Sequence, residues 1–305
     1  MADQETFNSP AEIRHRIGAN GTFSLNNVSG DIRIRGTDSD EVVVNARWEG
    51  GGDDRSLPLV VRRSEGSLHI ETDEGTGWFS FGHRGAIGFD VIVPSGARLD
   101  VQAVSADIDA LGLLGEQSYK TVSGDLVIDG AGGRVSATTV SGDVRLNGAQ
   151  PLEANVNTTS GDLEASAPTF QPVRLRTVSG DMNVRGGFAA GSQHTVESVS
   201  GDLSIESTTG LTVDTKRGLD FSKKHNRPIV FGDGSASLRF RSLSGDVHLS
   251  GATGLAAPAT PPAPPPPAPP QMNTEDHLEI LRALERGEID VEEASRRLEG
   301  AGSRG

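Results

Sequence analysis

Eight aspartates recur in one local context along this chain of 305 residues, and a column of carboxylates could bind Ca²⁺ or cleave a polysaccharide. Each follows a Ser-Gly pair, or Ser-Ala in one copy, and together they are Asp31, Asp107, Asp125, Asp143, Asp162, Asp181, Asp202 and Asp246. An active site normally breaks a repeat, whereas a turn demands the same residue every time. We therefore interpret these aspartates as structural corners that cap the local turn, with no metal, cofactor or catalytic residue among them.

The spacing of these corners indicates a repeat architecture. From Asp107 onward the sequence numbers of successive aspartates differ by 18, 18, 19, 19, 21 and 44, and those of Asp31 and Asp107 differ by 76. We interpret the gap of 44 as two periods and the gap of 76 as four. A constant period of about 20 residues favours a solenoid over a sandwich with irregular loops.

The residues around each corner predict two short strands per period. Apolar residues stand first and third after each aspartate, as in Leu126 and Ile128, and a second alternating pair such as Val135 and Ala137 precedes each serine. Just before the serine, a small residue and then Val, Thr or Leu occupy two successive positions that both favour burial, which indicates a bend or bulge. The predicted fold is an all-β solenoid of coils with about 20 residues each.

Two segments depart from this repeat and are candidate interaction loops. Residues 35–100 keep strand patterns without the motif and are interpreted as a broader, sandwich-like first part. Within them, a glycine-rich segment either covers the solenoid or offers a contact loop through Trp78, Phe79 and Phe81. Residues 211–234 predict a long solvated hairpin, or alternatively a docking or anion-binding loop that uses Lys223, Lys224 and Arg227.

The domain organisation follows from composition. We expect a disordered N-terminus (1–10), the solenoid (11–254), a proline-rich linker (255–272), a helical hairpin (273–300) and a disordered tail (301–305). In the hairpin, Leu278, Leu281 and Leu284 share one face, and Gly287 ends the first helix. So short a module rarely folds alone, so we expect it to bind a protein partner or to self-associate.

Bulk composition narrows the function. A net charge of −14 disfavours nucleic acid and direct binding to anionic lipid. Cysteine is absent, and no nucleophile elbow, Walker A loop, HExxH motif or dinucleotide fingerprint occurs. Without a signal peptide or an apolar run long enough to span a bilayer, we expect a cytoplasmic protein, with peripheral envelope contact or a surface location as alternatives.

The repeated unit [Val/Thr]-Ser-Gly-Asp-Φ-x-Φ, the segment FSLNNVSGDIRIRG and the segment VIVPSGARLDV resemble a bacterial family of β-strand-repeat proteins called putative adhesins, a domain of unknown function. This resemblance covers roughly residues 5–251. The ending MNTEDHLEILRALERGEIDVEEASRRLEG resembles a short helical module found with such domains, including in envelope-stress proteins. The resemblance implies a β-solenoid without catalytic residues.

These observations predict a non-enzymatic interaction or scaffold protein, linked through the resemblance to the bacterial envelope-stress response. A surface or secreted adhesin is the alternative. A carbohydrate-active β-helix enzyme is a third reading, and it would need non-repeating carboxylates in a cleft beside aromatic platforms. The aromatic content of 4% argues against that enzyme.

Overall fold

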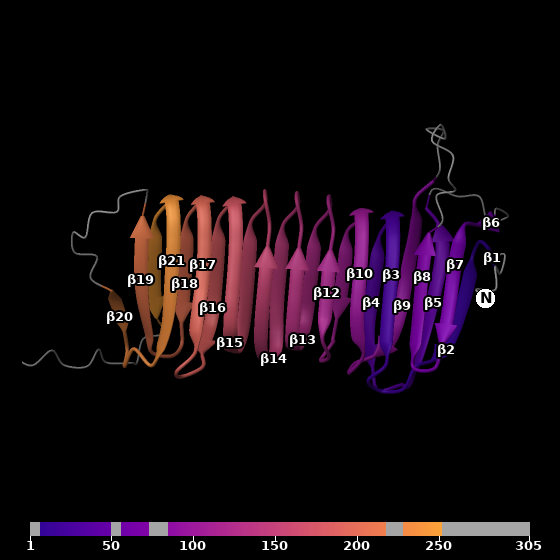
Figure 1. Ribbon diagram of the computed structural model, residues 1–305, viewed down its shortest axis with the longest axis horizontal. Coiled ribbons are helices and arrows are strands. Elements are labelled where there is room, and N and C mark those ends of the chain that lie inside the picture. The colour runs from indigo at the N-terminus through magenta and orange to yellow at the C-terminus, as the bar shows by residue number, and fades with distance from the viewer. Residues whose placement is uncertain (1–6, 50–55, 73–84, 218–227, 252–305) are drawn as a thin grey trace, which may run out of the picture. The chain divides into compact units, whose positions relative to one another are not determined.

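The computed structural model describes residues 7–49, 56–72, 85–217 and 228–251, and every regular element in these ranges is a β-strand (Figure 1). The described residues all belong to one compact unit, Met1–Ala257. Strands from successive coils lie side by side in one 20-stranded sheet, which encloses the core between two walls. We call these walls the pre-corner sheet and the post-corner sheet after their position relative to Ser-Gly-Asp. This architecture confirms the all-β, solenoid-like prediction.

The pre-corner sheet contains the strands that lead into each corner, and its neighbours are parallel except at the two ends. In spatial order they are β7 (Leu59–Ser64), β8 (Ser67–Thr72), β3 (Thr22–Ser29), β10 (Arg98–Ser105), β12 (Gln117–Lys120), β13 (Leu126–Thr138), β14 (Val144–Asn157), β15 (Leu163–Ser179), β17 (Gln193–Ser200), β21 (Ala236–Ser244), β19 (Leu211–Arg217) and β20 (Ile229–Phe231).

The post-corner sheet contains the strands that leave each corner. Strands β13, β14 and β15 belong to both sheets, because each continues through the opposite corner of its coil, which we call the second corner. The other members are, in spatial order, β2 (Ala11–Arg16), β5 (Glu41–Trp48), β9 (Ile87–Pro94), β4 (Ile32–Thr37), β11 (Ile108–Leu111), β16 (Met182–Phe188), β18 (Leu203–Ser207) and β22 (Val247–Gly251). A separate pair joins β1 (Phe7–Asn8) to β6 (Ser56–Leu57).

The core lies between the two sheets and consists mainly of aliphatic rows, one residue from each coil, with a few buried aromatic side chains such as Phe23 and Tyr119. Leu126 and Ile128 alternate with outward residues and are fully buried, as the period of two predicts. A row of small polar residues is buried at the edge of this core. There, Thr121 Oγ1 donates a hydrogen bond to the carbonyl oxygen of Ser123, at 3.2 Å. This bond offsets the cost of burying the Thr121 hydroxyl group, whereas the buried hydroxyls of Thr158, Ser198 and Ser242 in the same row have no hydrogen-bond partner among the described residues.

The two long gaps in the repeat are not whole coils, and our interpretation of them as four and two periods is wrong. Strand β4 pairs directly with β11, so Ile32 lies beside Ile108 although the two are far apart in the sequence. The residues between β4 and β10 form β5, β7, β8 and β9, which extend the two sheets beyond β3 and β4 at this end of the stack. The chain then returns to pair β10 with β3. At the other end, β21 lies between β17 and β19, and β22 pairs with β18. The chain covers each end of its own stack and then re-enters it.

The long hairpin predicted within residues 211–234 agrees with the antiparallel pairing of β19 and β20. Its basic residues Lys223, Lys224 and Arg227 lie outside the described residues, as do Trp78, Phe79 and Phe81. The predicted linker (255–272) and helical hairpin (273–300) also lie outside them.

Candidate interaction surface at the Ser-Gly-Asp corners

Seven of the eight corners turn on a glycine, and the eighth has Ala106 in its place. Gly142 has φ +134°, and a Cβ added there would lie 2.1 Å from the carbonyl oxygen of Gly124 in the preceding coil. The side chain is therefore excluded both by the backbone conformation and by the close approach of the neighbouring coil. The same conformation, with φ between +121° and +150°, occurs at Gly124, Gly142, Gly161, Gly180, Gly201 and Gly245.

The corner aspartates form a ladder that runs from coil to coil. Oδ1 of Asp107 accepts a hydrogen bond from the backbone N–H of Asp125, and Oδ1 of Asp125 accepts one from Asp143, both at 2.9 Å. The predicted cap of the local turn is thus replaced by a bond to the next coil. Further rungs at 2.8–2.9 Å continue through Asp162, Asp181, Asp202 and Asp246.

The first corner of the chain is built differently. The backbone N–H of Asp31 donates to Oε1 of Glu49 at 3.0 Å, so a glutamate that follows β5 supplies the acceptor that an aspartate supplies in later coils. Oδ2 of Asp31 accepts from Arg33 at 3.1 Å. In the adjoining coil Ala106 replaces the corner glycine. Glu49 was missed by sequence reasoning, because nothing in its flanking residues matches the repeat.

A row of exposed aliphatic side chains lies just before the serines. We predicted burial at this position and at the one before it, and half of that prediction is wrong: the small residue is buried and the aliphatic residue points outward. The alternation of the strand simply continues up to the serine, and the turn comes only at Ser-Gly. The row holds six of the eleven large apolar side chains that are exposed among the described residues, and Thr159 occupies the same place in one coil. These six are Val104 (50% exposed), Val122 (48%), Val140 (48%), Val178 (44%), Val199 (44%) and Leu243 (53%).

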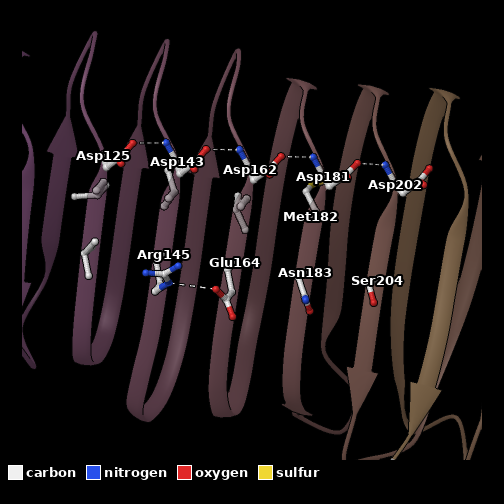
Figure 2. A pocket seen from close by; sticks show the side chains of 14 residues that line it. Asp125, Asp143, Arg145, Asp162, Glu164, Asp181, Met182, Asn183, Asp202 and Ser204 are labelled. Carbon is white, nitrogen blue, oxygen red and sulfur yellow. Dashed lines mark hydrogen bonds and ion pairs between the residues drawn. The ribbon is translucent and has the colours of Figure 1, made fainter.

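Beside the aspartates, on the post-corner sheet, lies a shallow groove of about 540 Å³ (Figure 2). The groove forms because the residue after each aspartate points into the core, which leaves a trough before the next outward side chain. Asp125, Asp143, Asp162, Asp181 and Asp202 line it. Across the trough from them are the outward side chains of Val127, Arg145, Glu164, Asn183 and Ser204. We call the aliphatic row, the aspartate row and the serines between them the corner edge.

The charges of the corner edge differ from those of the sheet faces. On the faces, opposite charges alternate from coil to coil, as in Arg134–Glu153 at 3.0 Å and Arg145–Glu164 at 3.2 Å. The corner aspartates instead place like charges about 4.8 Å apart, which costs roughly 0.9 kcal/mol per neighbouring pair in water. No ion pair between described residues involves Asp125, Asp143, Asp162, Asp181 or Asp202. The edge therefore presents unneutralised negative charge to solvent.

Other candidate chemistry is sparse in the part of the chain that the structure describes. No group of three or more His, Asp and Glu residues could hold a metal ion there. No helix there is long and apolar enough to cross a membrane. Two buried groups titrate abnormally, but both lie in the core away from the edge. Burial lowers the pKa of His194 to about 4, and burial also raises the pKa of the Tyr119 hydroxyl.

The fold and the repeated corner define a class of protein, the parallel β-solenoid built from Ser-Gly-Asp coils. The family model Toastrack DUF4097 matches residues 20–251, and this chain belongs to that family. No curated protein matches the chain.

Solved structures similar to this chain include a putative adhesin from Bacteroides fragilis, at 11% identity and a TM-score of 0.47, covering 81% of this chain and 98% of that one. A putative lipid binding protein from Parabacteroides distasonis has 12% identity and a TM-score of 0.30, with 82% and 96% covered. A putative adhesin from the same organism has 9% identity and a TM-score of 0.34, with 81% and 98% covered.

Proposed function

We propose that this chain is a non-enzymatic interaction protein that binds a protein partner along the corner edge. The observation that carries the proposal is the aliphatic row, in which six side chains of the same kind stand between 44% and 53% exposed. Single exposed valines are common on protein surfaces, whereas a row of exposed apolar side chains, interrupted here only by Thr159, marks a contact site.

The rigidity of the edge supports a role in binding. Backbone hydrogen bonds join each corner to both neighbours, as where Gly142 N–H donates to the Ser160 carbonyl oxygen at 3.2 Å and Ser141 N–H donates to the Val122 carbonyl oxygen at 2.9 Å. The Asp143 carboxylate adds a further bond to the next coil. A surface fixed in this way loses little conformational entropy when a partner covers it.

The aspartate row serves the solenoid in this proposal as a structural ladder and not as a metal or catalytic site. The predicted helices of residues 273–300 would supply a second contact, either with a partner or with another copy of the chain. The resemblance of that tail to a module of envelope-stress proteins supports a role in that response, at the inner side of the cell envelope.

Site-specific photo-crosslinking in cells of the source organism tests this function. A photoreactive residue at Val140, inside the row, should give a discrete adduct with another protein. The same residue at Val230, which is 54% exposed but outside the row, is the matched control. Adducts at both positions, or at neither, would overturn binding through the corner edge. Repeating the Val140 experiment without residues 271–305 separates the contribution of the tail.

A further inference from the structure

We infer that the segment recognised at the corner edge is both amphipathic and cationic, with a line of apolar side chains flanked by lysine or arginine. This inference rests on the proposed function and adds the chemistry of the partner. The geometry that carries it is the juxtaposition of two rows, one aliphatic and one acidic, on the two sides of the same Ser-Gly turn.

The two rows are matched coil by coil. In one coil Val122 is 48% exposed and Asp125 follows it across the turn, and the next coil repeats this arrangement with Val140 and Asp143. Like residues in adjacent coils lie about 4.8 Å apart. A partner that covers the aliphatic row therefore brings its own flank over the aspartates.

The charge of that flank is determined by the aspartate row. From Asp107 to Asp202, one oxygen of each corner carboxylate is held by the N–H of the next coil, as in the bond from Asp162 N–H to Asp143 Oδ1 at 2.9 Å. That bond fixes the carboxylate in place without neutralising it. A neutral flank would strip water from these charges, and an acidic flank would repel them. A cationic flank replaces the lost water with charge-assisted hydrogen bonds and relieves the repulsion along the row.

The same two rows argue against a second copy of this chain as the occupant. A two-fold axis parallel to the stack would place the aliphatic row of one copy against the aspartates of the other. A two-fold axis across the stack would place aspartates against aspartates at equal spacing. Either arrangement leaves charge buried without a partner, which disfavours association. An anionic membrane surface is repelled by the aspartates, and a zwitterionic bilayer offers them no net positive charge.

The length of the edge favours a linear protein segment over a small molecule. From Val104 to Leu243 the row passes through seven coils, or six steps, about 29 Å in all. A helix of about 19 residues has this length at a rise of about 1.5 Å per residue. Such a helix can present one apolar stripe with basic residues beside it.

The experiment uses full-length protein and two synthetic amphipathic helices of about 19 residues with the same leucine face. One carries lysine on its polar face and the other glutamate, and fluorescence anisotropy reports binding. The triple variant Val122→Thr, Val140→Thr, Val178→Thr removes apolar surface with almost no change of shape. Thr159 already occupies this row in the native chain, so these substitutions are compatible with the fold. The triple variant Asp143→Asn, Asp162→Asn, Asp181→Asn removes charge and keeps the acceptor oxygen.

Matched controls lie elsewhere on the described surface. Leu111→Thr with Val230→Thr removes equally exposed apolar groups, and Asp38→Asn with Glu65→Gln removes exposed charges. We expect the lysine helix to lose at least tenfold in affinity with either row variant and less than twofold with either control. The glutamate helix should not bind measurably. Melting temperatures of all variants establish that each is folded.

Four outcomes overturn the inference. Equal loss of affinity in the Asp38→Asn, Glu65→Gln control would mean that the lysine helix binds through net charge alone. Equal binding of the glutamate helix, or binding of neither helix, would remove the cationic partner. Binding to phosphatidylcholine vesicles that the valine variants abolish would identify a lipid surface instead. Under each outcome, a discrete protein adduct at Val140 and not at Val230 would still support the proposed function, so the two failures are distinguishable.

Discussion

Both corners of each coil reverse the chain between the two sheets, but they differ in how closely the conformation is repeated from coil to coil. At the Ser-Gly-Asp corner the glycines share one conformation, and neighbouring coils approach so closely that a Cβ on Gly142 would meet a carbonyl oxygen at 2.1 Å. The second corner passes through residues 130–133 in one coil and 186–192 in another. There Gly191 also has a positive φ, +74°, but nothing lies within 4 Å of a Cβ. Elsewhere in the second corner the approach is as close as at Ser-Gly-Asp, since a Cβ on Gly186 (φ +146°) would lie 1.9 Å from the Ala167 carbonyl oxygen. The Ser-Gly-Asp corner thus repeats one crowded conformation in every glycine-bearing coil, whereas the second corner varies in length and combines crowded with open positions.

The sharpest test of this comparison is a matched pair of glycine substitutions. Gly142→Ala should lower the free energy of unfolding by about 3 kcal/mol or more, because it combines a strained φ with a backbone clash. Gly191→Ala should cost only about 1 kcal/mol, the strain of the left-handed conformation alone. Chemical denaturation of both variants measures the difference, and equal losses would contradict the contrast between crowded and open positions.

A buried titratable group lies just after the second corner, in β17, so this side of the coil should be the more acid-sensitive of the two. His194 is buried beside Phe188, with Nε2 2.5 Å from Ser192 Oγ, and its pKa is lowered to about 4. The unfolded chain binds the proton near pH 6.5, so stability is full above that pH and falls as the pH drops toward 4. The loss from this residue should reach about 2 kcal/mol by pH 5, at about 1.36 kcal/mol per pH unit.

Replacement of this histidine isolates its contribution from that of the carboxylates. Leu238 occupies the neighbouring place in the same inward row, so His194→Leu keeps an apolar residue there. Between pH 7 and pH 5, the free energy of unfolding should fall more steeply with decreasing pH in the native chain than in His194→Leu. Parallel curves would show that His194 does not control the acid sensitivity of this side of the coil.

The aspartate ladder at the Ser-Gly-Asp corners should contribute less to the free energy of unfolding than the corner glycine does, but more than a surface ion pair does. Asp143→Ala removes an acceptor for the N–H of Asp162 and should cost about 0.5–2 kcal/mol, by analogy with a lost helix cap. Asp143→Asn retains an acceptor oxygen and should cost less. If the row is structural, EDTA should leave the melting temperature unchanged. A Ca²⁺-dependent rise that disappears in Asp143→Asn and Asp162→Asn would instead identify an ion site.

The smallest effect is expected on the sheet faces, between the two corners. Arg134 and Glu153 form an exposed pair at 3.0 Å, with side chains 60% and 40% exposed. Removing either charge should change the free energy of unfolding by about 0.5 kcal/mol or less, and salt should diminish the effect. A double-mutant cycle with Arg134→Gln and Glu153→Gln measures it. A coupling energy above about 1 kcal/mol would mean that the ion pairs on the sheet faces stabilise the fold as much as the aspartate ladder does.

The periodic part of the molecule could be predicted from the sequence because its determinants are local. The alternation around Leu126 and Val135 identifies the inward faces, and the repeated Ser-Gly-Asp identifies the corner. The exposed valines could not be predicted in this way, because valine favours strands on either face and its exposure depends on where the turn begins. The bond from Asp143 to the next coil was also missed, since a carboxylate at a turn can bond within the turn or beyond it.

The ends could not be predicted from spacing alone. The long gap between Asp202 and Asp246 suits two coils or one outward excursion equally well, and only pairing distant in sequence, such as Leu203 with Val247, distinguishes them. Glu49 lies in such an excursion, and no local pattern marks it as the acceptor for Asp31.

The excursions at the two ends also determine an order of events during folding. In a middle coil the pairing partner lies one short coil further along the chain, as Val144 does from Leu126, whereas Ile32 must wait for the much later Ile108. Closing the longer loop costs about 1.3 kcal/mol more in chain entropy. During synthesis, the strand that follows Asp31 therefore cannot pair with β11 until about a third of the chain has left the ribosome. We therefore expect the middle coils to pair first and the N-terminal strands to dock afterwards onto a stack that has already formed.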